Sequence, residues 1–170
     1  MIRPPTAVAA AGTLNDHGRM DWPNPMTESQ EWGWQADIDL PSERGASRLV
    51  LDDLLEQLAI HGWEHSDIFG VHLAAEEAIV NAILHGNRLD PTKKVRVSCR
   101  VSSRHVRVEV TDEGPGFRPE EVPDCTREDR LEEPGGRGLL LMRSFMTRIE
   151  YNDRGNSVLL EKKLGAADEK

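Results

Sequence analysis

The chain has 170 residues, enough for one domain with a hydrophobic core. Acidic residues outnumber basic ones by 30 to 21, so the net charge is -9, which argues against nucleic acid as a direct partner because phosphate backbones are bound by clustered Lys and Arg. No apolar run approaches the roughly 20 residues that span a bilayer, so we expect no membrane segment. The 2 cysteines lie in no metal or redox spacing, and we expect a cytoplasmic protein in which both are reduced.

The first half of the chain is predicted to contain one strand and two helices. Residues 1–33 are proline-rich and aperiodic, which predicts a disordered extension. The alternation over 34–40 predicts a half-buried strand. A helix with Ser42 as its N-cap and an apolar stripe follows and ends at Gly62. A second, more apolar helix is predicted to begin near the cap Ser66 and to end at Gly86.

The second half is predicted to be mostly strands. Residues 95–101 and 106–110 are alternating β-branched strands joined by a tight turn. Residues 118–134 are acidic and polar, typical of a mobile loop. A helix over 139–146 and a hairpin formed by 149–151 and 158–160 complete the order β-α-α-β-β-loop-α-β-β. This order predicts a two-layer α/β sandwich, with helices on one face of a mixed, mostly antiparallel sheet. The predicted domain spans 34–165, and 166–170 form a tail.

Polar residues interrupt the second predicted helix at intervals of four. Glu77, Asn81 and His85 lie about one turn apart and therefore on one stripe. Burying such groups without partners is costly, so the stripe indicates a functional surface. Glu76 points about 100° away from Glu77, which predicts a surface position. We expect His85 to pack or to hydrogen-bond behind the site, because no second histidine lies at metal-ligand spacing.

Two glycine motifs follow this helix. Asp112 ends a strand, and Gly114 and Gly116 after it permit close approaches and positive φ angles. The run Gly135–Leu139 (Gly-Gly-Arg-Gly-Leu) leads into a helix, whose first amides can bind phosphate. Each motif alone is also typical of an ordinary turn, so the functional interpretation depends on the order and spacing of the motifs.

The combination of E-x-x-x-N on a helix, D-x-G-x-G and G-G-x-G-L resembles the Bergerat ATP-binding fold of the GHKL superfamily, which includes gyrase, histidine kinases and MutL. Over about residues 34–164 the compact form resembles the anti-sigma factor serine/threonine kinases most. The resemblance implies an ATP-dependent protein kinase that sequesters a sigma factor and phosphorylates an anti-anti-sigma protein of the STAS type. It also implies ATP and Mg²⁺ as cofactors and favours a homodimer.

The resemblance also assigns roles to individual residues. Glu77 matches the catalytic base that activates a serine hydroxyl, and Asn81 matches the Mg²⁺ ligand. Asp112 matches the carboxylate that accepts a hydrogen bond from the adenine amine. The implied nucleotide contacts are Asn81, Asp112, Gly114, Gly116, Gly136, Arg137, Gly138, Leu139 and Ser157.

Two positions depart from the family pattern. Arg137 replaces an apolar residue and could reach the phosphates or be solvated. Asn156 stands where these folds often have threonine, which leaves open whether Asn156 or Ser157 contacts the nucleotide. Residues 118–134 correspond to the ATP lid, and Arg48 on the exposed side of the first helix corresponds to a partner contact.

Two alternative functions stay open. A histidine-kinase-type ATP-binding domain would need a phospho-accepting histidine on a helical hairpin upstream, and residues 1–33 do not fit one. A nucleotide-dependent binding module would sequester a regulatory partner without phosphoryl transfer. The presence of both Glu77 and Asn81 argues against this second alternative.

Overall fold

The computed structural model describes residues 13–14, 20–21, 32–116 and 136–165, and the chain divides into a unit of residues 1–30 and a unit of residues 31–170. In the first unit, β1 (Thr13–Leu14) and β2 (Met20–Asp21) form a short antiparallel ladder. The prediction of disorder over 1–33 missed this ladder. The other residues up to 31, the predicted lid and the predicted tail lie outside the described residues.

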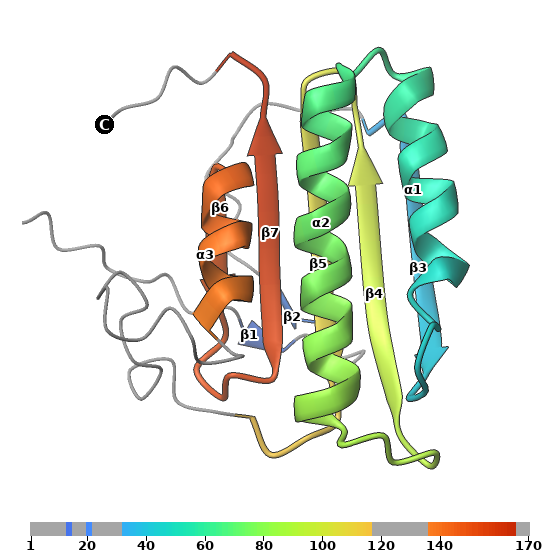
Figure 1. The fold of residues 1–170 in the computed structure, drawn as a ribbon, viewed down its shortest axis with the longest axis vertical. Coiled ribbons are helices and arrows are strands. Elements are labelled where there is room, and N and C mark those ends of the chain that lie inside the picture. Colours follow the sequence, from blue (N-terminus) through green and yellow to red (C-terminus); the bar gives the residue numbers. More distant parts are fainter. Residues whose placement is uncertain (1–12, 15–19, 22–31, 117–135, 166–170) are drawn as a thin grey trace, which may run out of the picture. The chain divides into compact units, whose positions relative to one another are not determined.

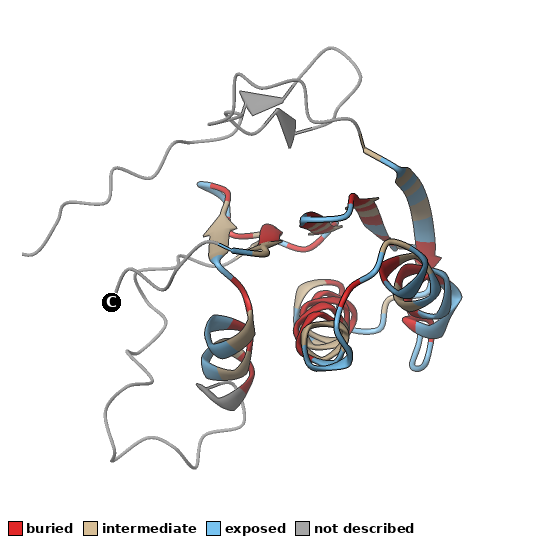
Figure 2. Ribbon diagram, turned by 90° about the horizontal axis from the view of Figure 1, so that it is seen from above, coloured by how far each residue is buried: buried red, intermediate tan, exposed pale blue. Residues whose placement is uncertain are grey.

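The described part of the second unit is a two-layer α/β sandwich, as predicted. Its five strands pair only antiparallel, in the order β3-β4-β5-β7-β6. Helices cover one face of this sheet (Figures 1 and 2). The strands are β3 (Trp34–Pro41), β4 (Lys94–Val101), β5 (His105–Asp112), β6 (Arg148–Tyr151) and β7 (Ser157–Lys163). The helices are α1 (Arg48–Ile60), α2 (His65–Asn81), its π-helical continuation η1 (Ala82–Gly86) and α3 (Gly136–Phe145).

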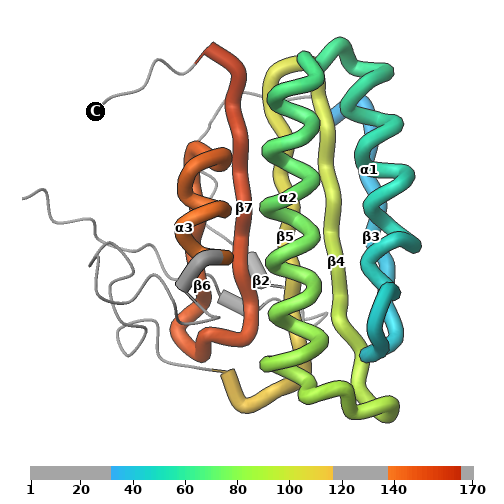
Figure 3. Tube along the Cα trace, viewed as in Figure 1, coloured from blue at the N-terminus to red at the C-terminus, as the bar shows by residue number. Residues whose placement is uncertain are grey.

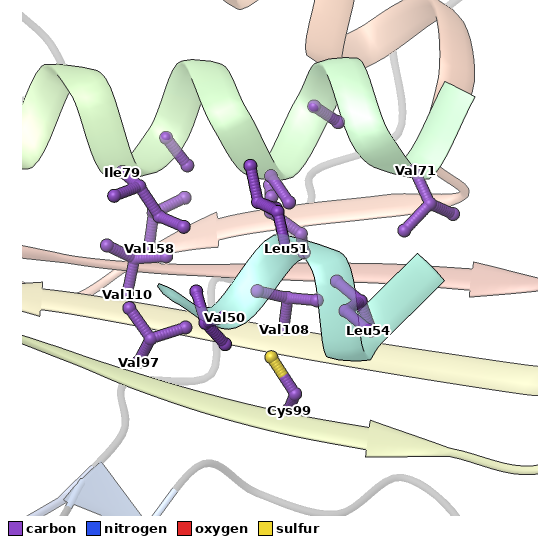
Figure 4. Packing of buried hydrophobic residues seen from close by; sticks show 14 of the residues in the cluster. Val50, Leu51, Leu54, Val71, Ile79, Val97, Cys99, Val108, Val110 and Val158 are labelled. Atoms are coloured by element: carbon purple, nitrogen blue, oxygen red, sulfur yellow. The ribbon is translucent and has the colours of Figure 1, made fainter. Parts of the chain in front are cut away.

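The core lies between the sheet and the helices. Every second residue of the strands points into it, as the alternation of buried positions along β4 shows. Residues from both layers pack together in Figure 4: Val50, Leu51 and Leu54 from α1, Val71 and Ile79 from α2, and Val97, Cys99, Val108, Val110 and Val158 from the sheet. Burial raises the pKa of the Cys99 thiol to about 12. This thiol therefore stays protonated and unreactive, as its predicted core position implies.

The first helix begins later than the sequence predicts. Ser42 is the predicted N-cap, but α1 begins at Arg48 and Ser42 is a buried loop residue. Gly45 has φ +82°, a left-handed conformation that interrupts any helix begun at Ser42. At the other end, Gly62 has φ +81° and follows the last turn of α1, which confirms the predicted end of the helix.

The second helix begins one residue before its predicted cap. Glu64 is the extended residue that precedes the helix, so Ser66 lies within the first turn. The segment His65–Gly86 is long and apolar enough to cross a bilayer, but 44% of its most apolar window is buried in the fold. It packs between α1 and α3 (Figure 3). Its buried residues belong to the core of the domain, namely Val71, Ala74, Ala75, Ala78, Ile79, Ala82 and Ile83.

Polar and aromatic contacts fasten the end of α3 to the start of α2. The Lys162 ammonium group donates to the main-chain oxygen of Phe145 at 3.0 Å and pairs with Asp67 of α2 at 2.9 Å. The Phe69 and Phe145 rings meet edge to face with centroids 6.3 Å apart. The two helices are thus held together along the side of α2 that carries the candidate site.

Candidate functional site

Glu77 and Asn81 face each other on α2. The side-chain amide of Asn81 donates a hydrogen bond to Oε1 of Glu77 at 3.0 Å, and both side chains are half-buried. The hydrogen bond confirms the shared stripe predicted from the four-residue spacing. Because an ionised carboxylate only accepts hydrogen bonds, the pairing turns the amide nitrogen of Asn81 toward Glu77. The amide oxygen is left to face a cation or a donor.

The first turn of α3 lies against this pair. Gly138 is buried, and a Cβ atom at this position would overlap the Glu77 carboxylate. Leu139 packs against the core beside it. Gly136 and Arg137 are the first residues of α3, and the surroundings of their side chains lie outside the described residues. The fold therefore brings the second glycine motif to the helix that carries the Glu–Asn pair.

Two other polar residues of this helix point elsewhere. Glu76 pairs with His72 at 3.7 Å, and its side chain is 47% exposed, which confirms its predicted surface position. His85 is exposed, so the packing role predicted as one option is wrong. His85 lies in the π turn η1, which departs from the regular α-helical repeat on which the shared stripe was predicted.

Asp112 ends β5 and is buried against η1. Its Oδ1 accepts a hydrogen bond from the Gly114 amide at 2.7 Å. A Cβ atom on Gly86 would overlap the Asp112 carboxylate, and one on Gly114 would overlap the main-chain oxygen of Gly86. Burial raises the pKa of Asp112, against the opposing effects of the Gly114 hydrogen bond and the Arg154 charge. With Oδ1 bonded, Oδ2 can accept from a directed donor such as an exocyclic amine.

Gly116 is required for a close contact with the hairpin before β7. It has φ +76°, and a Cβ atom there would overlap the main-chain oxygen of Arg154. The Arg154 side chain in turn donates to the main-chain oxygen of Gly114 at 3.0 Å. The D-x-G-x-G turn and this hairpin therefore hold each other in place.

Asn156 and Ser157, the two residues that the sequence left open, both lie beside the end of β5. The side-chain amide of Asn156 donates to the main-chain oxygen of Asp112 at 2.8 Å, and its oxygen accepts from Asn152 at 2.9 Å. Ser157 is buried, and its hydroxyl shares a 2.7 Å hydrogen bond with Thr111, the residue before Asp112. Both side chains thus have hydrogen-bond partners within the protein, and the nucleotide contact stays a prediction for either residue.

Sequence reasoning gave no role to Asn87, which organises the site from behind. The buried side chain donates to the main-chain oxygen of Lys94 at 2.9 Å and accepts from the amide of Glu113 at 2.8 Å. It fastens the end of η1 to β4 and to the turn after Asp112. An available signal was an asparagine directly after a glycine at a helix end, where its side chain can satisfy main-chain groups.

The residues at this site fit a magnesium nucleotide. The glycines at 86, 114 and 138 let protein groups of the site pack closely, with the Asp112 carboxylate against Gly86, the Gly86 main chain against Gly114 and the Glu77 carboxylate against Gly138. Within the described residues, no three His, Cys, Asp or Glu side chains form a metal-binding group. A hard divalent ion beside the Glu77–Asn81 pair would take the oxygen of Asn81 and complete its shell with phosphate and water oxygens, as Mg²⁺ does.

An antiparallel sheet covered by helices on one face, with a buried carboxylate at a strand end that packs against η1 and a Glu–Asn pair on α2, is the arrangement of the Bergerat-type ATP-binding domains. The family described as the histidine kinase-like ATPase domain matches residues 40–162. The chain belongs to this family.

The chain is similar to bacterial proteins named as serine-protein kinases and as anti-sigma factors. A serine-protein kinase RsbW of Oceanobacillus iheyensis is 24% identical over 76% of this chain and 84% of its own length. An anti-sigma F factor of Clostridium perfringens is 29% identical over 71% of this chain and 87% of its own length. A crystal structure of the RsbU and RsbW domains of a Mycobacterium tuberculosis protein matches with a TM-score of 0.50 and 23% identity, covering 85% of this chain and only 34% of that one. At 23% identity, the similarity to this crystal structure shows the fold alone.

Proposed function

We propose that this protein is an ATP-dependent serine/threonine kinase that acts as an anti-sigma factor by partner switching. The observation that carries the proposal is the Glu77–Asn81 pair, joined at 3.0 Å and placed against the glycine-rich first turn of α3. A module that only sequesters a partner has no need of a carboxylate held at this position. Relatives named as a serine-protein kinase and as an anti-sigma factor support both halves of the proposal.

In the proposed mechanism the residues of the site have separate tasks. Oδ2 of Asp112 accepts from the exocyclic amine of adenine. The first turn of α3 receives the phosphates at its amide groups. Bound Mg²⁺ would be held by the oxygen of Asn81 and would neutralise charge on the triphosphate.

Glu77 then acts on the protein substrate. Its carboxylate orients the serine hydroxyl and takes the proton as the serine oxygen forms a bond to the γ-phosphorus. The bond between that phosphorus and the bridging oxygen breaks, and ADP leaves. Phosphoserine on the partner and ADP are the products.

The partners follow from the same proposal. We expect the protein to bind a sigma factor in one state and an anti-anti-sigma protein of the STAS type in the other, in the cytoplasm and as a homodimer. Arg48 begins α1 and is exposed, as a residue that contacts partners must be. The domain that carries these activities spans residues 34–165.

Incubation with labelled ATP, Mg²⁺ and the anti-anti-sigma candidate encoded nearby tests the proposal. We expect labelled phosphoserine on the partner, and no label on a partner whose acceptor serine is replaced by alanine. In parallel, the sigma factor should co-elute with the protein until unphosphorylated partner is added. Binding of ATP and partner without any phosphate transfer would reject the kinase and leave the sequestering module.

A further inference from the structure

We infer that Gly138 is a positioning residue for Glu77, because the absence of a side chain in the first turn of α3 leaves the space that the catalytic carboxylate occupies. The inference rests on the proposed kinase function and deepens it. Sequence reasoning assigned this glycine to the phosphates alone, whereas the structure places Glu77 directly against it.

The contact confines the carboxylate from two sides. A Cβ atom on Gly138 would overlap the carboxylate and lie 2.7 Å from Cγ of Glu77, below the 3.0 Å that real Cβ contacts respect. From the other side, Asn81 donates to Oε1 of the same carboxylate at 3.0 Å. An amide on α2 and the main chain of α3 therefore set the position of the base together.

Other reasons for a glycine at this position are weak. Glycine is among the poorest residues for a helix, because it loses the most backbone freedom on folding. Gly138 lies within α3 and is not among the glycines with positive φ, so a left-handed conformation does not explain it. The remaining requirement is space, and Glu77 fills that space.

Replacing Gly138 by alanine should move the base without unfolding the domain. The atoms in the way are the far end of a flexible side chain, so the structure can adapt by displacing the carboxylate. A displaced Glu77 loses its hydrogen bond from Asn81 and its alignment with the substrate hydroxyl. Misplacement of a catalytic group by about 1 Å can lower a rate by about 10²-fold.

Gly70 provides a matched control at the same helix–helix interface. It is a buried glycine of α2, and a Cβ atom there would lie 2.7 Å from the Phe145 ring of α3. Gly70→Ala therefore disturbs the packing of α2 on α3 at the end away from Glu77. If general loosening of the interface lowers activity, this variant will lower it as well.

The test is single-turnover transfer at saturating ATP. We expect Gly138→Ala to lose about 10²-fold in rate, with ATP affinity close to that of the wild type, and Gly70→Ala to retain the rate. In a Glu77→Ala background, Gly138→Ala should cause no further loss. As a readout in the nucleotide-free protein, the NMR signals of the Asn81 side-chain amide should shift in Gly138→Ala as in Glu77→Ala, and not in Gly70→Ala.

Several outcomes overturn the inference. Weaker ATP binding with an unchanged saturating rate would make Gly138 a phosphate contact only, and equal losses in both glycine variants would assign the effect to the interface. If Gly138→Ala does not fold, the same change in the Glu77→Ala background must fold, because the space is then open. A wild-type protein that transfers no phosphate refutes the proposed function, while the Asn81 signals still decide the positioning contact.

Discussion

The side-chain amide of Asn156 donates to the main-chain oxygen of Asp112 at 2.8 Å, while the amide of Asp112 donates to the main-chain oxygen of Asn156 at 2.9 Å. Asp112 is the last residue of β5 and Asn156 directly precedes β7, so the two residues hold each other at one end of the antiparallel β5–β7 pair. The Asp112 side chain is the carboxylate assigned to adenine. Asn156 therefore supports the site through the main chain of Asp112.

Asn156→Ala should weaken both folding and nucleotide binding. It leaves the Asp112 oxygen and the Asn152 amide without their present partner, and an unsatisfied buried group costs about 1–3 kcal/mol. We expect the free energy of unfolding to fall by about that amount in urea titrations, and the ATP affinity to fall in calorimetry. Asp153→Ala, at an exposed neighbour in the same turn, is the control. Unchanged stability and affinity in Asn156→Ala would contradict the supporting role.

Asp112→Asn should separate stability from binding. The pKa of Asp112 is raised by burial, so the folded protein keeps this proton to higher pH than the unfolded chain does. The carboxylate therefore makes folding less favourable as the pH rises from the usual aspartate range through the raised pKa. Because the amide that replaces the carboxylate carries no charge, we expect the nucleotide-free variant to be at least as stable as the wild type at about pH 7.

Asp112→Asn should also lower the affinity for ATP about ten- to hundredfold, since a charge-assisted hydrogen bond contributes about 1.5–3 kcal/mol. Asn81→Ala should lose affinity only in the presence of Mg²⁺. Thermal unfolding from acid to neutral pH and calorimetry with ATP measure the two effects. Wild-type affinity in Asp112→Asn would remove the adenine assignment.

Asn87→Ala should be among the more destabilising changes near the site. The buried side chain makes one bond to Lys94 and one to Glu113, and both main-chain groups lose their partner together. We expect a loss of about 2–6 kcal/mol in the free energy of unfolding, the sum of two such groups. Asn87→Asp keeps the oxygen that accepts from the Glu113 amide, so this variant should recover part of the lost free energy of unfolding. A loss below about 1 kcal/mol would show that water replaces both bonds.

Sequence patterns that lie within a single helix or strand predicted much of this structure. The alternation over Trp34–Leu40 and the four-residue spacing of Glu77 and Asn81 depend only on helix and strand periodicity, and both are confirmed. The order of elements then determined the two-layer sandwich.

The parts that the sequence did not predict depend on contacts between distant segments or on single dihedral angles. The late start of α1 follows from the φ of Gly45, and no periodicity in the sequence predicted the π turn that carries the exposed His85. The contact of Gly138 with Glu77 forms only when α3 packs on α2. A glycine motif can thus be recognised in a sequence, but the group that needs the space cannot.

Glu161 should make stability depend on acid pH. Burial alone would raise its pKa, but contact with His105 at 3.6 Å and a hydrogen bond from Arg148 at 3.1 Å outweigh it and lower the pKa from 4.5 to about 2. The stabilisation is complete above the ordinary value and is lost as the pH falls toward about 2. We expect Glu161→Gln to lose up to about 3 kcal/mol at neutral pH and progressively less in acid.

Urea titrations at several pH values measure this difference, with exposed Glu43→Gln as the control. A difference between wild type and Glu161→Gln that is the same at every pH would mean that lost packing, rather than the charge, is responsible.

Glu77→Ala should abolish phosphoryl transfer while ATP and partner binding persist, whereas Glu76→Ala should retain all three. Glu77 shares its stripe with Asn81 and touches the first turn of α3, so it can face the phosphate that is transferred. Glu76, one position earlier, pairs with His72 on the exposed side of α2. A general base contributes about 10²–10⁴ in rate, so single-turnover assays will separate the variants. Wild-type transfer by Glu77→Ala would refute the mechanism, and equal losses in both variants would point to a disturbed helix in place of a missing base.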